Sequence, residues 1–221
     1  MCIRDRMVTS NTTAKEISDL FIKTGRIQYA VISYIIVGFV IFGKSFITLW
    51  VGEEYMSVYY ITLMIFVCTT IPSIQNLGNS ILMAYNKMKR KTIIVIFASL
   101  LSFVAIFPCA KYWGAVGCSF PIFLCIVITY GPILNKMYAR VIGINVRQFW
   151  IEILKMPLGP SLFVVAGLLI LPYTDFSDWG KLGLGIIAFS VFYLPVSYRL
   201  SLNNYERNYF NSFMRKIKFV R

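Results

Sequence analysis

The chain has 221 residues and a formal net charge of +13, because 22 Lys and Arg residues face only 9 Asp and Glu. Apolar residues make up 58% of it, charged residues make up 14%, and the mean hydropathy is +0.70. Soluble globular domains carry about a quarter of their residues as charged ones. The composition therefore excludes an ordinary soluble enzyme, a disordered tail and a nucleic-acid-binding module, and it indicates a polytopic membrane protein.

Histidine and cysteine usage removes several chemistries. The chain contains no His, which excludes His-based proton relays, His–metal sites and Ser-His or Cys-His catalysis within it. Its five Cys residues have no regular spacing and form no CxxC motif. We therefore expect no metal site, no cofactor and no enzymatic activity.

The first six residues are unusual. Residues 1–6 (MCIRDR) read back as ATG TGT ATA AGA GAC AGN, which resembles the transposon end sequence used to prepare sequencing libraries. We expect them to be an artefact, with the native chain resuming at about Met7, within a longer gene. The alternative is a genuine short cytoplasmic N-terminus.

Residues 7–26 are predicted to form a cytoplasmic amphipathic linker. Thr13 and Glu16 match a capping box. The apolar positions that follow with helical spacing are Ile17, Leu20 and Phe21. We expect a short helix that lies on the inner face of the membrane and leads into the first span.

Residues 27–200 are predicted to form an all-α membrane domain, a polytopic helix bundle with six transmembrane helices. A helix needs about 20 mainly apolar residues to cross the hydrocarbon of a bilayer. The six apolar stretches are Ile27–Phe42 (extendable to Val51), Val58–Tyr85, Thr92–Ala110, Gly114–Lys136, Met156–Tyr173 and Trp179–Tyr198.

Basic residues orient this bundle. With six spans, 19 of the 22 Lys and Arg residues fall on one side of the membrane, and only Lys44, Lys111 and Lys181 fall on the other. The positive-inside rule then predicts that both chain termini are cytoplasmic. Residues 201–221 form a basic amphipathic tail, which indicates either an interfacial helix on anionic lipid or a disordered topogenic tail.

The second predicted span is the most polar one. Seven of its residues fall on one side of a helix at 100° per residue, namely Thr69, Pro72, Ser73, Gln75, Asn76, Asn79 and Ser80. One interpretation makes Gln75, Asn76 and Asn79 the substrate-binding wall of a water-filled cavity open to the cytoplasm. The other makes them hydrogen-bonding contacts between helices. The residues alone leave both interpretations open.

Basic residues surround the predicted inner mouth of the bundle. Lys23 and Arg26 enter the first span, and residues 87–91 form a basic loop after the second. An anionic lipid headgroup, such as a pyrophosphate, would be attracted there, so Lys23 and Arg26 are candidate substrate-binding residues. The alternative role of most of these charges is to set the topology.

Six short segments carry a family resemblance. They are residues 20–28 (LFIKTGRIQ), 38–47 (GFVIFGKSFI), 49–55 (LWVGEEY), 71–76 (IPSIQN), 84–89 (AYNKMK) and 112–117 (YWGAVG). These segments resemble the second half of bacterial polysaccharide flippases of the Wzx, or O-antigen, type in the MATE-like flippase superfamily. The resemblance covers about residues 7–155, and the last two predicted helices are less specific.

The resemblance implies two helical lobes around a central cavity that work by alternating access. It implies that the cargo is a lipid-linked oligosaccharide, a polyprenyl-pyrophosphate-linked repeat unit moved from the inner to the outer leaflet of the bacterial inner membrane. The implied partners are this substrate, membrane lipids and other polysaccharide assembly proteins, without nucleic acid. The sequence departs from the family by lacking the first lobe, so we expect a fragment that forms part of the second lobe.

Other function classes stay open. Another MATE-like exporter, or a non-catalytic membrane scaffold, would have the same kind of helices. A membrane glycan polymerase or ligase would need acids, bases or arginines on a large outer loop. The predicted outer loops are short, and their acidic residues are Glu53, Glu54, Asp175 and Asp178.

Overall fold

The computed structural model describes residues 14–170, 174, 176, 178–201, 203, 206 and 207. These residues form helices and no strand, which confirms the predicted all-α class. The elements after the long helix α2 (Ala14–Trp50) are the 3-10 turn η1 (Glu53–Tyr55), α3 (Ser57–Ile74), α4 (Asn76–Ala84), α5 (Met88–Ile128), the π-helical turn η2 (Thr129–Ile133), α6 (Leu134–Ile142), α7 (Val146–Leu154), α8 (Leu158–Ile170) and α9 (Trp179–Leu200). The predicted artefact at residues 1–6 lies outside the described residues, and so do residues 202, 204, 205 and 208–221 of the predicted tail.

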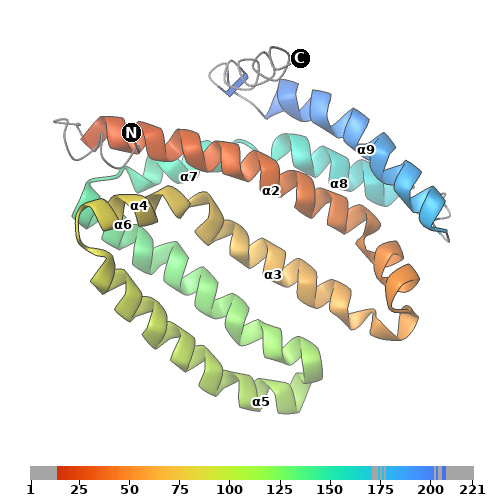
Figure 1. Ribbon diagram of the computed structural model, residues 1–221, viewed down its shortest axis with the longest axis horizontal. Coiled ribbons are helices and arrows are strands. Elements are labelled where there is room, and N and C mark those ends of the chain that lie inside the picture. Colours follow the sequence, from red (N-terminus) through yellow and green to blue (C-terminus); the bar gives the residue numbers. More distant parts are fainter. Residues whose placement is uncertain are drawn as a thin grey trace, which may run out of the picture.

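Helix α2 lies in the middle of the molecule (Figure 1). It contacts α3, α4, α7, α8 and α9. It continues without a break from the predicted linker through residue 26 to Trp50. No proline interrupts it, and Gly25 serves close packing, since a Cβ there would lie 2.7 Å from the ring of Phe149. Thr13 of the predicted capping box lies outside the described residues.

Five helical stretches of the described residues are long and apolar enough to cross a membrane. They are Ala14–Trp50, Ser57–Ala84, Met88–Ile142, Val146–Ile170 and Trp179–Leu200. Large apolar side chains cover the outside of the bundle, as on α5, where Phe97 is 71% exposed and Leu101 is 65% exposed. Such a surface is unfavourable in water and favourable in lipid. Both observations fit a multi-pass membrane protein.

The third of these stretches reverses direction. A straight helix of its 55 residues would be about 80 Å long, against about 30 Å of bilayer hydrocarbon. Gly114 interrupts the helix with φ 59° and ψ −142°, which glycine adopts without strain. Helix α5 folds back there (Figure 1), and a Cβ on Gly117 would lie 2.2 Å from the carbonyl oxygen of Cys109. The turn falls between the third and fourth predicted spans.

Residues 137–155, which lie between the fourth and fifth predicted spans, are largely helical. Helix α7 begins after Asn145, whose Oδ1 accepts a hydrogen bond from the backbone N–H of Gln148 at 3.1 Å. Its apolar face is buried, with Phe149 1% exposed and Ile153 3% exposed. Pro157 then lies between α7 and α8, in keeping with its preference for helix starts.

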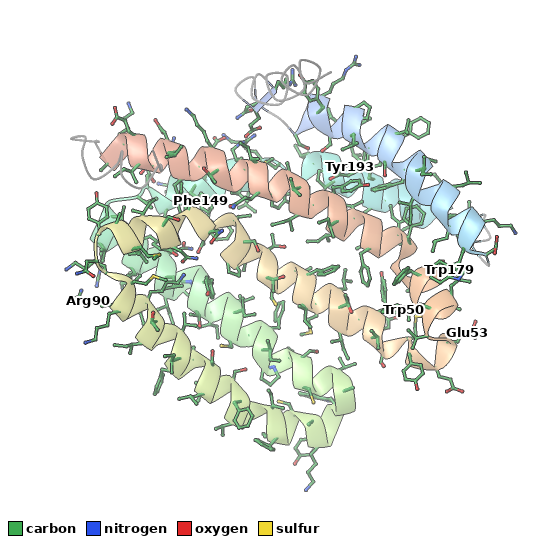
Figure 2. All side chains as sticks on the ribbon, viewed as in Figure 1. Trp50, Glu53, Arg90, Phe149, Trp179 and Tyr193 are labelled. Carbon is green, nitrogen blue, oxygen red and sulfur yellow. The ribbon has the colours of Figure 1, made fainter. Side chains whose placement is uncertain are left out.

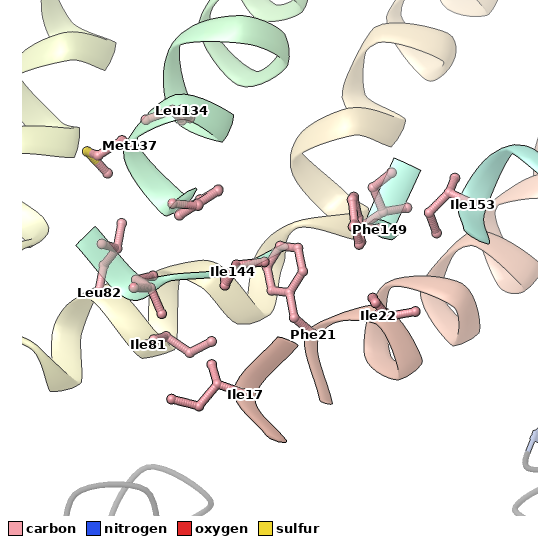
Figure 3. Close-up of a cluster of buried hydrophobic side chains, with 13 residues drawn as sticks. Ile17, Phe21, Ile22, Ile81, Leu82, Leu134, Met137, Ile144, Phe149 and Ile153 are labelled. Atoms are coloured by element: carbon pink, nitrogen blue, oxygen red, sulfur yellow. The ribbon is translucent and has the colours of Figure 1, made fainter. Parts of the chain in front are cut away.

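Two clusters of buried apolar side chains hold the helices together. The larger joins α2, α4, α6 and α7 (Figure 3). Within it, the ring centroid of Phe21 lies 4.7 Å from that of Phe149 and 5.9 Å from that of Tyr138. The smaller cluster joins α2 to α9 and includes Phe42 and Tyr193. Helix α2 therefore links both clusters.

The two ends of the bundle carry different side chains. Figure 2 shows Trp50, Trp179 and Glu53 at one end and Arg90 at the opposite end. Trp50 and Trp179 both pack on Phe46, with ring centroids 5.5 and 5.9 Å apart. Tryptophan at one boundary and a basic loop at the other is a common arrangement in membrane proteins.

Candidate functional site

An open groove of about 560 Å³ lies between α2 and the junction of α3 with α4. Its walls are neutral, because four of the lining residues are polar and uncharged and the other four are apolar. The lining residues are Ile27, Gln28, Val31, Ile32, Pro72, Ser73, Asn76 and Asn79. A smaller apolar pocket of about 440 Å³ lies near the Gly114 turn, between Met64 and Trp113.

The helix breaks beside the groove. Pro72 has no backbone N–H, so the preceding turn of α3 lacks one hydrogen bond. Gln75 then departs from helical geometry, with φ −98° and ψ 8°, and separates α3 from α4. Figure 1 shows α4 leaving the line of α3 at this point. The break turns the polar residues of α4 toward α2.

Asn76 and Asn79, both predicted site residues, line the groove. Asn79 Nδ2 donates a hydrogen bond to Asn76 Oδ1 at 3.1 Å. Behind this pair, Lys91 of α5 donates to Asn79 Oδ1, and its Nζ lies 5.4 Å from the ring centroid of Tyr130. Lys91 is only 5% exposed, and it makes no ion pair with any described residue. A buried ammonium without a carboxylate is costly, so the oxygen of Asn79 and the ring face of Tyr130 carry its stabilisation.

Gln75 does not line the groove, which corrects its assignment as a wall residue. It is 1% exposed, and its Nε2 donates to Asn135 Oδ1 at 2.9 Å. The break at Gln75 itself rotates this side chain between the helices, away from the position that a regular 100° per residue gives it. Gln75 therefore follows the second interpretation, a polar contact between helices.

Arg26 does not face the groove either, which corrects its assignment as a substrate-binding residue. It is 4% exposed, and its guanidinium binds both carboxylate oxygens of Glu206, from Nε at 2.5 Å and from Nη2 at 3.2 Å. Its Nη1 donates to the backbone oxygen of Glu152 at 2.8 Å and pairs with the carboxylate at 3.3 Å. Nη2 also donates to the backbone oxygen of Ser201 at 3.2 Å. The donors of Arg26 are thus used within the fold.

Lys23 lies close to the groove without lining it. It is half-buried and precedes the lining residue Ile27 by four positions, which places both on one face of α2. The structure therefore brings Asn76 and Asn79 together in the groove, leaves Lys23 one helical turn away, and removes Gln75 and Arg26.

Two functional candidates were missed from the sequence, Gln28 and Lys91. Lys91 was grouped with the basic loop, yet Lys87, Lys89 and Arg90 are exposed while Lys91 is buried. A signal was present, because Lys91 shares a helix face with Met88 and Ile94, which pack on the larger apolar cluster. The signal for Gln28 was its polar side chain within the first predicted span, Ile27–Phe42.

Within the described residues, no group of three or more His, Cys, Asp or Glu side chains could hold a metal ion. Comparisons with protein-family models, with curated proteins and with solved structures find no match to this chain. The features of the chain that bear on its function are therefore the groove, the broken helix beside it and the charges around them.

Proposed function

We propose that the chain forms part of the second lobe of a Wzx-type, MATE-like flippase for lipid-linked oligosaccharides. Its cargo is a polyprenyl-pyrophosphate-linked repeat unit, which moves from the inner to the outer leaflet of the bacterial inner membrane by alternating access. The observation that carries this proposal is the neutral polar groove beside the break between α3 and α4. Broken helices at a binding site are typical of transporters that work by alternating access.

The charges near the groove support the orientation of this cargo. Arg90 lies at the end of the bundle opposite Trp50 and Trp179 (Figure 2), and the positive-inside rule assigns a basic end to the cytoplasm. Lys23 lies one turn beyond the groove on α2. A pyrophosphate at the membrane surface would be attracted to Lys23 and to the exposed Lys87, Lys89 and Arg90, while the sugar enters the groove.

The proposal includes six membrane crossings and cytoplasmic termini. The stretch Met88–Ile142 contributes two crossings when its arms on either side of Gly114 are counted separately. An even number of crossings leaves both ends of the chain on one side. A first lobe supplied by another polypeptide segment would complete the cavity.

Photo-crosslinking tests this function. A photoreactive polyprenyl-pyrophosphate-linked oligosaccharide is added to membranes that contain the chain, and labelling is competed with the unmodified lipid or with ethidium, a cationic dye typical of drug exporters. We expect competition by the sugar lipid alone, and weaker labelling of Asn76→Leu. Equal competition by ethidium would favour another MATE-like exporter, and the absence of labelling would favour a scaffold.

A further inference from the structure

Lys91 fixes the orientation of two amide side chains beside the groove. An ammonium group only donates hydrogen bonds, so the Asn79 atom that faces Lys91 has to be Oδ1. Asn79 Nδ2 is then a donor, and it donates to Asn76 Oδ1 at 3.1 Å. Asn76 Nδ2 is left pointing its two N–H groups away from this chain of bonds, without a partner among the described residues. The ammonium of Lys91 therefore fixes which side-chain atom is oxygen and which is nitrogen in both Asn79 and Asn76.

Two hydrogen bonds in series, from Lys91 to Asn79 and from Asn79 to Asn76, transmit the polarising effect of the buried ammonium to the groove. Lys91 is 5% exposed and is not a lining residue, whereas Asn76 is exposed and lines the groove. Hydrogen bonds in series polarise one another, so the ammonium strengthens the donor character of Asn76. This wall therefore favours an oxygen that accepts hydrogen bonds.

Gln28, on the opposite wall of the groove, has hydrogen-bonding groups that complement the N–H donors of Asn76. Its side-chain amide makes no hydrogen bond to a described residue, and its Oε1 is buried without a partner. Gln28 is itself a lining residue, so rotation of its side chain brings this amide to a ligand in the groove and removes the free-energy cost of the unpartnered oxygen. The groove thus combines donors at Asn76 with an unused acceptor at Gln28.

We propose that the groove is a subsite for a neutral sugar, in which Asn76 Nδ2 donates to one hydroxyl oxygen, Gln28 Oε1 accepts from a hydroxyl, and Lys91 acts as the positioning residue. A hydroxyl both donates and accepts, so it satisfies both walls. A phosphate is disfavoured because no lining side chain carries a charge to balance it. The inference rests on the proposed function and deepens it, because it assigns the sugar part of the cargo to this groove.

The variant Asn79→Asp separates this role from a structural one. A carboxylate at position 79 gives Lys91 a counter-ion, so the thermal stability of the protein should stay the same or rise. The same carboxylate has no N–H to donate to Asn76, so the orientation of Asn76 is released. Lys91→Arg keeps a donor and should keep binding. Thr70→Ala is the matched control, because Thr70 of the same helix does not line the groove and donates its hydroxyl to the backbone oxygen of Phe66 at 2.8 Å.

Binding is measured on the full chain in lipid nanodiscs. The probes are maltose and chitobiose, followed by saturation-transfer NMR, and inorganic pyrophosphate, followed by its phosphorus line width. We expect saturation transfer to at least one disaccharide in the wild type, in Lys91→Arg and in Thr70→Ala. We expect binding roughly tenfold weaker in Asn79→Asp, the order of one lost hydrogen bond.

Three outcomes would overturn the assignment. The first is the absence of saturation transfer to either disaccharide, and the second is saturation transfer that Asn79→Asp does not reduce. The third is a broadening of the phosphorus line of pyrophosphate that Lys91→Met abolishes, which would make the groove a phosphate site. The result of the photo-crosslinking experiment, which tests the flippase function, does not depend on the result of the disaccharide measurement. Disaccharide transfer without labelling by the lipid-linked oligosaccharide would leave the sugar subsite in place and reject the flippase.

Discussion

A buried arginine stabilises a fold only while its carboxylates are present. Arg26 binds Glu206, which is itself 4% exposed, and it contacts Glu152 through both backbone and side chain. These contacts join α2 to the end of α7 and to the segment after α9. Burying charged groups is costly, so the network tolerates loss of one member poorly.

Arg26→Met should therefore destabilise the protein strongly. It leaves the Glu206 carboxylate buried and unpaired, which typically costs about 3–5 kcal/mol. Thermal unfolding of the purified protein in detergent should show a midpoint lower by roughly 10 °C.

The matched control is Lys155→Ala, which removes another partner of the same Glu152. Lys155 is 61% exposed, so its pair should contribute less than about 1 kcal/mol. Equal midpoints for Arg26→Met and Lys155→Ala would contradict a buried network at Arg26.

Gly78→Ala should also destabilise the fold, although alanine favours helix. An added Cβ would lie 2.8 Å from Cζ of Tyr138, whose ring is 1% exposed. Overpacking of this kind costs about 1–3 kcal/mol, which outweighs a helix-propensity gain of about 1 kcal/mol. Gly183→Ala in α9 is the control, because nothing lies within 4 Å of its Cβ position and stability should be unchanged or higher. Unfolding midpoints that fall equally in both variants would remove the packing explanation.

Among the elements, the broken pair α3 and α4 determines where the groove lies. Pro72 was recognisable in the sequence as a source of a kink. The position of the break at Gln75 was not, because it depends on the hydrogen bond to Asn135, which lies 60 residues away. Helix α7 was not predictable either, because its position also depends on contacts far along the chain. Its 9 residues are too few to span a membrane by themselves, and they are held by packing on α2.

Pro72→Ala tests how far the proline maintains the break. It restores a backbone donor in α3 and should straighten the junction and narrow the groove. In a variant that carries Asn76→Cys, the rate of labelling by a water-soluble maleimide should fall several-fold after Pro72→Ala. An unchanged rate would mean that the bond from Gln75 to Asn135 holds the break alone.

For the whole molecule, the all-α class and most apolar stretches were predictable because they depend on local composition. The count of six crossings stays a prediction, since the described residues contain five apolar stretches and one of them turns back at Gly114. The role of Arg26 was not predictable, because its partners lie 126 and 180 residues along the chain. A local pattern cannot distinguish such an arginine from a topogenic one.

Cysteine labelling in cells tests the topology. In a chain without its native cysteines, the single substitutions Glu53→Cys and Lys111→Cys should react with an impermeant maleimide from outside, and Lys89→Cys only after permeabilisation. All three positions are exposed in the structure. A Lys111→Cys variant that reacts only from inside, or not at all, would exclude the outer turn at Gly114.

The Arg26 network also sets an order of events during synthesis. Ribosomes add about 5–20 residues per second, so the 180 residues between Arg26 and Glu206 take about 10–40 s to make. Throughout that interval α2 is already translated, and its arginine has to be solvated by water, lipid headgroups or the insertion machinery. A nascent chain released before Glu206 would retain an arginine lacking this partner, a defect that membrane quality-control proteases could recognise.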